Sequence, residues 1–151
     1  MISPADVLMV AVCIGLIALE GNRGITPALA DFLCVLTGSI IIRYAYVPLS
    51  ENMRPSDAYL LLFLTVIVLT AVLSIYISTR LKVSTSGLEA GVGAVLGLGS
   101  GLILSYTFLQ WLVIRYGMAA PIVRDSIVSW LLFDYTGFNE LRQFLQTLMG
   151  R

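Results

Sequence analysis

Few side chains in this 151-residue sequence could carry chemistry, and histidine is absent. The chain therefore lacks the side chain most used for acid–base catalysis and for Ser-His-Asp triads. Its two cysteines, Cys13 and Cys34, lie inside apolar runs, where a thiol behaves as a small hydrophobic group. No two carboxylates have a spacing that would force a general acid–base pair. We therefore expect no catalytic residue, no metal site and no cofactor.

The ionisable residues near the apolar segments are the remaining candidates for function. Asp31 is the one placed clearly inside such a segment, and a charge at the bilayer centre costs about 2.5–3.5 kcal/mol. Either Asp31 still reaches the lipid headgroups, or it faces the other helices, pairing with Arg23 or lining a polar path. Arg23 itself could bind a lipid phosphate or a neighbouring carboxylate. The full set is Asp6, Glu20, Arg23, Asp31, Arg43 and Glu89.

The composition indicates an integral membrane protein. Charged residues make up 12% of the chain and hydrophobic residues 58%, with a formal net charge of zero. A water-soluble domain usually has about 25% charged residues, so this chain has too few to cover its surface. A nucleic-acid-binding protein would carry a clustered positive excess, and we expect no nucleic-acid partner.

Four apolar segments predict an all-α, polytopic membrane domain over residues 1–118. A helix needs about 20 apolar residues to cross a bilayer, and short connections favour an up-down order. The first segment is the weakest, because only thirteen residues run without a charge or a break. Residues 20–24 form a polar, glycine-rich turn, after which Thr26 could cap the second helix and Pro27 could begin it. The predicted spans are about 5–20, 25–44, 58–78 and 90–114.

Residues 119–151 form a C-terminal segment of different character. Apolar residues gather on one face of a predicted amphipathic helix, which would lie in the membrane interface or dock against the bundle. An ordinary packing helix outside the membrane is the alternative. Six arginines on one side of the spans against three basic residues on the other favour cytoplasmic termini. The apolar face comprises Phe138, Leu141, Phe144, Leu145 and Leu148.

The fourth segment carries small residues at every fourth position, which we call the glycine ridge: Gly93, Gly97, Gly101 and Ser105. Ridges of this kind let two helix backbones approach closely in a membrane. Glu89 lies on the same face one turn earlier. The spacing also imitates part of a dinucleotide-binding fingerprint, but that motif requires a preceding strand, which a membrane helix does not offer. The ridge therefore predicts helix packing and self-association.

Two ordered motifs resemble the colicin V production protein family of bacterial inner-membrane proteins. In the first, Asp6 opens the first helix, a Gly-x-Arg-Gly-like hairpin contains Arg23 and Gly24, and Gly38 follows in the second helix. The second is a Gly-Leu-acidic run, Gly87 to Glu89, followed by Gly93, Gly97 and Gly101.

The sequence departs from the family pattern at three places. Ala90 stands where a basic residue is common, and Ser100 stands where a basic residue often precedes the last glycine. Residues 26–28 replace a stretch that usually contains an acid, which leaves Asp31 as the nearest candidate. A role that needs an arginine at the entrance of the fourth helix is therefore not expected.

The resemblance implies a multi-pass protein of the bacterial inner membrane, connected with colicin V production or export and with envelope homeostasis. The leading hypothesis is a non-enzymatic protein that contacts the lipid bilayer and binds a second copy or other membrane proteins through the glycine ridge. The alternative is a small transporter or channel component. It is based on the position of Arg23, Asp31 and Glu89 near helix entrances.

Overall fold

Four long helices and one short helix make up the described part of the chain. The computed structural model describes residues 3–80, 87–117 and 120–127. The four long helices are each long and apolar enough to cross a membrane, which confirms the predicted all-α membrane fold. The helices are α1 (Pro4–Arg23), α2 (Ile25–Ser50), α3 (Pro55–Arg80), α4 (Gly87–Tyr116) and α5 (Pro121–Arg124).

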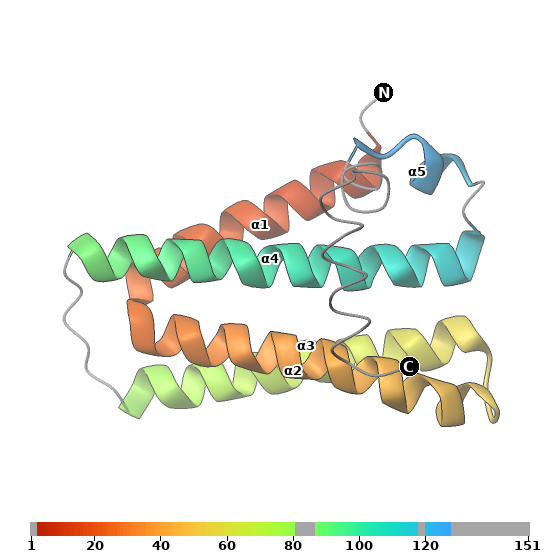
Figure 1. Ribbon diagram of the computed structural model, residues 1–151, viewed down its shortest axis with the longest axis horizontal. Helices are drawn as coiled ribbons and strands as arrows, with labels where there is room; N and C mark the ends of the chain where they lie inside the picture. Colours follow the sequence, from red (N-terminus) through yellow and green to blue (C-terminus); the bar gives the residue numbers. More distant parts are fainter. Residues whose placement is uncertain (1–2, 81–86, 118–119, 128–151) are drawn as a thin grey trace, which may run out of the picture.

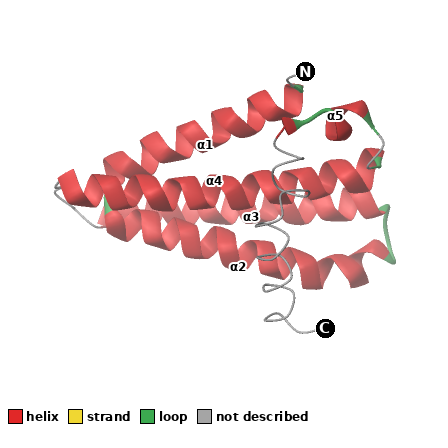
Figure 2. Cartoon of the chain, turned by 45° about the horizontal axis from the view of Figure 1, so that its top comes forward, coloured by secondary structure: helices red, strands yellow, loops and turns green. Residues whose placement is uncertain are grey.

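Helix α4 is the central element of the bundle. It contacts α1 on one side and α2 and α3 on the other, and α2 also packs along α3. Figure 1 shows α4 between α1 and the α2–α3 pair, with successive helices running in opposite directions. Figure 2 shows the same order from a turned view, with α5 beside the beginning of α1. Every other long helix is therefore positioned by its contact with α4.

The first helix is longer than its uncharged stretch, because polar residues at both ends remain helical. Ser3 caps its beginning: the Ser3 hydroxyl accepts from the Ala5 amide at 3.3 Å, and the Asp6 carboxylate accepts from the Ser3 amide at 2.9 Å. These reciprocal bonds satisfy amide groups that a helix start leaves unpaired. The resulting 20 residues are enough for a span.

The predicted turn over residues 20–24 is wrong in extent. Helix α1 continues to Arg23, and Gly24 alone reverses the chain with a φ of 85°. This left-handed conformation suits glycine, which has no Cβ. The Gly24 amide donates to the Glu20 carbonyl at 3.2 Å and so closes α1. Because α2 begins directly at Ile25, Thr26 is not its cap and Pro27 is not its first residue.

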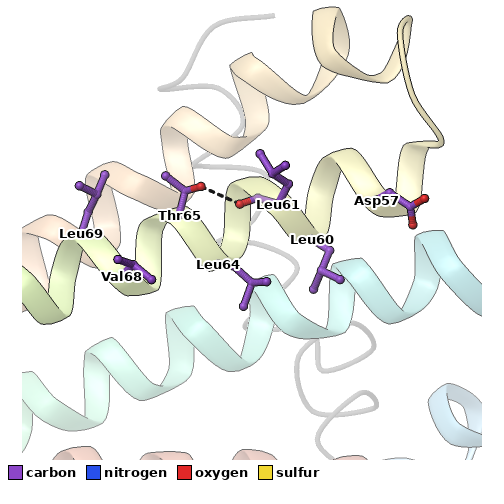
Figure 3. A pocket seen from close by; sticks show the side chains of 7 residues that line it. All are labelled: Asp57, Leu60, Leu61, Leu64, Thr65, Val68 and Leu69. Carbon is purple, nitrogen blue, oxygen red and sulfur yellow. Dashed lines mark hydrogen bonds between the residues drawn. The ribbon is translucent and has the colours of Figure 1, made fainter.

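The outer face of α3 is apolar and exposed. Val68, Val72 and Ile75 are 59%, 60% and 61% exposed, which a water-soluble protein rarely allows over a whole helix face. On this face the Thr65 hydroxyl donates to the Leu61 carbonyl of its own helix at 2.8 Å (Figure 3). A polar group that is satisfied inside its helix can face lipid. The shallow groove of about 540 Å³ on this helix is lined mainly by leucine side chains and is part of a lipid-facing surface.

The glycine ridge of α4 packs against α1 of the same chain. A Cβ added at Gly97 would lie 2.5 Å from the Leu16 carbonyl oxygen, and one at Gly101 would lie 2.9 Å from the Cys13 Cα. Gly93 contacts the Glu20 carbonyl in the same way. The ridge residues therefore let the two backbones touch over about two helical turns.

This contact changes the interpretation of the ridge. We predicted self-association through it, but α1 already covers the ridge within one chain. A second copy could reach Gly93, Gly97 and Gly101 only if α1 moved away. The ridge is therefore an intramolecular packing surface.

Larger side chains fill the other half of the α1–α4 contact. Ala5 and Met9 of α1 form a buried cluster with Leu109 and Leu112 of α4 and with Val123. Figure 1 shows α1 diverging from α4 toward this end, as expected where large side chains replace glycine. Val123 belongs to α5, so residues 120–127 pack on the bundle. The predicted amphipathic face between 138 and 148 lies outside the described residues.

We expect Gly97→Ala to destabilise the protein and Gly91→Ala to leave it at least as stable. The added methyl group at Gly97 would meet the backbone of α1, whereas nothing lies within 4 Å of a Cβ at Gly91. Overpacking of this kind typically costs about 1–3 kcal/mol. Thermal unfolding of both variants in detergent measures the difference, and equal melting temperatures would contradict the α1–α4 contact.

Candidate functional site

Four polar residues meet inside the bundle near the α1–α2 reversal, and we call them the ionic cluster: Glu20, Arg23, Asp31 and Ser74. Helix α1 supplies Glu20 and Arg23 one turn apart, α2 supplies Asp31, and α3 supplies Ser74. The Arg23 Nη1 atom lies 3.5 Å from Asp31 Oδ2 and 3.8 Å from Glu20 Oε1. Three helices are therefore joined through one guanidinium group.

Ser74 completes the pairing of Asp31. Its hydroxyl donates to Asp31 Oδ2 at 2.6 Å and accepts a hydrogen bond from Arg23. A hydroxyl can do both at once, so Ser74 links the guanidinium to the carboxylate. The Asp31 oxygen thus has two partners, one ionic and one hydrogen-bonded.

The acidic members of the cluster are buried. Glu20 is 1% exposed and Asp31 is 6% exposed, while the Arg23 side chain retains 26% exposure. A buried carboxylate is unfavourable unless charge and hydrogen bonds compensate it. Arg23 is therefore the member of the cluster that reaches the surroundings.

Close packing of α4 buries Glu20. A Cβ at Gly97 would stand 3.1 Å from the Glu20 Cβ, and Gly93 lies against the Glu20 backbone. Side chains at these two positions would push α1 away and open Glu20 to its surroundings. The glycine ridge and the ionic cluster are therefore one structural unit.

Three carboxylate oxygens of the cluster lack hydrogen-bond donors among the described residues. Both Glu20 oxygens and the Asp31 Oδ1 atom are buried without a hydrogen-bond donor among the described residues. The Glu20 carboxyl group lies beside that of Asp31, and both lie within 4 Å of the same Arg23 nitrogen. Two carboxyl groups thus share one cation. In the described ranges, no three histidine, cysteine or acidic side chains are grouped to hold a metal ion.

The structure brings together three of the ionisable residues that the sequence indicated, Glu20, Arg23 and Asp31. Of the two arrangements considered for Asp31, the structure has the one that faces the bundle and pairs with Arg23. Gly24 provides the reversal that places them opposite each other. Gly38 lies elsewhere on α2, where it lets the Val66 side chain of α3 approach.

Two other residues of the acidic and glycine motif lie in the first turn of α4. Glu89 is half-buried in the first turn of α4, and Gly87 begins that helix with open space where a Cβ would be. Of the three residues on which the transport alternative is based, Arg23 and Asp31 form an ion pair.

Asp6 has a different environment at the opposite end of α1. Its Oδ1 atom accepts from the Ser126 hydroxyl at 2.5 Å, and its Oδ2 atom accepts from the Ile127 amide at 3.1 Å. The Ser3 hydroxyl also donates to the Ile122 carbonyl at 3.1 Å. Asp6 therefore ties the segment after α4 to the beginning of α1.

Glu20 was expected only as one of the ionisable residues near the apolar segments, and Ser74 was not expected in the site. Glu20 was assigned to the turn because glycine and asparagine follow it, yet it lies three residues before Arg23 on a continuing helix. That spacing places the two side chains on one face. Ser74 is a lone hydroxyl in an apolar run, and no pattern in the sequence distinguishes it.

Comparison with protein-family models, with curated proteins and with solved structures finds no match for this chain. Helix length and hydropathy define its class: it is a multi-pass helical membrane protein. Within that class, the ionic cluster and the glycine ridge distinguish this bundle.

We expect Arg23→Gln to destabilise the protein strongly, because it leaves Glu20 and Asp31 without a cation. Removing one partner of a buried ion pair typically costs about 3 kcal/mol or more. The matched control is Arg124→Gln, which breaks the pair with Asp125, where the two side chains are 68% and 43% exposed. Exposed pairs contribute about 0–1 kcal/mol. Chemical unfolding in detergent compares the variants, and an equal loss would mean that the buried pair is not structural.

Proposed function

We propose that the chain is a non-enzymatic protein of the bacterial inner membrane, of the colicin V production type, that acts in toxin production or export and in envelope homeostasis. The ordered motifs from Asp6 to Gly101 support this proposal. The observation that carries it is the convergence of motif residues on one unit, since Arg23, Gly93 and Gly97 all contact Glu20 or its backbone. A motif whose members meet in space acts as one part of the protein.

Two further contacts support a role for the motif as a whole. Asp6 holds the segment after α4, and Gly24 makes the one-residue reversal between α1 and α2. Asp6 and Gly24 therefore each maintain a particular contact of the bundle, as Gly93 and Gly97 do. Because the ridge is covered by α1, we propose that partners in the membrane, a second copy included, bind on the outer, lipid-facing surfaces.

Complementation tests this function. A bacterial strain that produces colicin V but lacks its own protein of this type should regain toxin in the medium when this chain is expressed. Arg23→Gln should lose that activity, and Arg124→Gln should retain it, because only the first change touches the ionic cluster. Inhibition zones on a sensitive lawn measure the toxin. A chain that reaches the membrane without restoring toxin release would contradict the proposal.

The second candidate function is a small transporter or channel component. The specific observation in its favour is the ionic cluster, because ionisable groups inside membrane helices commonly mark ion and proton pathways. Arg23 links the buried carboxyl groups to the surroundings through its 26% exposed side chain.

Flux measurements in reconstituted liposomes distinguish the two functions. A transporter should produce ion or solute flux that Asp31→Asn alters and that Asp57→Asn leaves unchanged. Asp57 is the matched control because it is an exposed aspartate in the first turn of α3. Flux equal to that of empty vesicles would exclude the transport function.

A further inference from the structure

The ionic cluster has one more carboxyl group than it has cations. Glu20 and Asp31 bring two carboxyl groups, and Arg23 brings one positive charge among the described residues. If both acids were ionised, the cluster would hold a net negative charge in a segment that crosses the membrane. Such a charge is unfavourable at low dielectric, so a cation or a proton must compensate it.

The two carboxyl groups differ in their ion pairs and hydrogen bonds. Asp31 has the closer ion pair, 3.5 Å from Arg23, and a 2.6 Å hydrogen bond from Ser74. Within the described part of the chain, Glu20 has the longer ion pair, 3.8 Å from Arg23, and neither of its oxygens has a hydrogen-bond donor there. Glu20 is also the more buried residue, at 1% exposure. Glu20 is therefore the less well compensated of the two carboxyl groups.

We propose that Glu20 and Asp31 form a proton-binding site inside the membrane, in which Glu20 holds one exchangeable proton and through it donates a hydrogen bond to Asp31. The proton forms an O–H bond with a Glu20 oxygen, and that O–H hydrogen-bonds to the neighbouring carboxylate. The Asp31 Oδ1 atom, buried without a donor in the described chain, is the available acceptor. Proton binding thus satisfies unpartnered atoms on both residues and leaves one carboxylate for one arginine.

Other charged and titratable groups around the site are consistent with this assignment. Arg23 faces the pair from α1 and Ser74 faces it from α3. Cys34, one turn along α2, already accepts a hydrogen bond from Thr70. Helix α4 presents glycine to Glu20, and its nearest acidic residue is Glu89, one turn before Gly93. Among the side chains that the structure describes, Arg23 is the cation that lies within 4 Å of both carboxyl groups.

Infrared spectroscopy of the full chain in lipid bilayers tests the site directly. At neutral pH we expect one protonated carboxyl band, which shifts when glutamate is labelled with ¹³C at its side-chain carboxyl group. Glu20→Gln should abolish the band. Glu51→Gln, which changes an exposed glutamate at the end of α2, should leave it unchanged. Absence of the band, its persistence in Glu20→Gln, or a shift with labelled aspartate instead would overturn the proposal.

Thermal stability provides a second readout that does not depend on spectral assignment. A proton held in the folded protein stabilises it at low pH, so the melting temperature should fall as pH rises through proton release. Glu20→Gln should lose this pH-dependent shift, because the amide replaces the protonated acid, and Glu51→Gln should keep it. An unchanged pH dependence in Glu20→Gln would contradict the site.

Salt exchange separates a proton from a bound metal cation. Replacing choline chloride with sodium or potassium chloride at equal ionic strength should not change the melting temperature. A rise specific to one cation would mean that the cation, and not a proton, balances the second carboxyl group. These readouts are independent of toxin release and flux, so they test the proton site separately from either proposed function.

Discussion

The close approach of α1 to the glycine ridge of α4 is the constraint on which the bundle depends. At Gly93 and Gly97 the neighbouring atoms belong to the backbone of α1, so the helices could not tolerate even a methyl group without moving. Van der Waals contact of this density is the main source of helix association in lipid, where burial of apolar surface brings little gain. The same contact encloses Glu20. A substitution that separates α1 from α4 would therefore also expose Glu20.

The distribution of side-chain size along α4 explains the shape of the α1–α4 pair. Its first half carries glycines against α1, and its second half carries leucines against Ala5 and Met9. The helices consequently touch at the end that contains the ionic cluster and separate toward the other end (Figure 1). The ionic cluster thus lies where α1 and α4 are closest, and the apolar cluster around Met9 lies where the two helices are farther apart.

Much of the fold could be predicted from the sequence, because it contains four apolar segments and each break between them is visible as charge or glycine. The ends of the helices were less predictable. Capping by Ser3 and the single-residue reversal at Gly24 both extend α1 beyond its uncharged stretch. A hydropathy profile takes no account of these local hydrogen bonds. It therefore underestimates the length of the first span.

The site was predictable only in part. The spacing of Gly93, Gly97 and Gly101 predicted a close contact, but a repeat on one helix does not say whether its partner belongs to the same chain. Asp31 and Arg23 were identified by their charge. Ser74 joins them from a segment 43 residues beyond Asp31, a relation that only the three-dimensional arrangement of α2 and α3 establishes.

The bonds from Asp6 to Ser126 and Ile127 have a topological consequence. Because they bring the start of α1 and the segment after α4 to one place, and four crossings lie between, both emerge on the same side of the bilayer. Among the described residues, the opposite side holds the Gly24 reversal, the end of α3 and the beginning of α4.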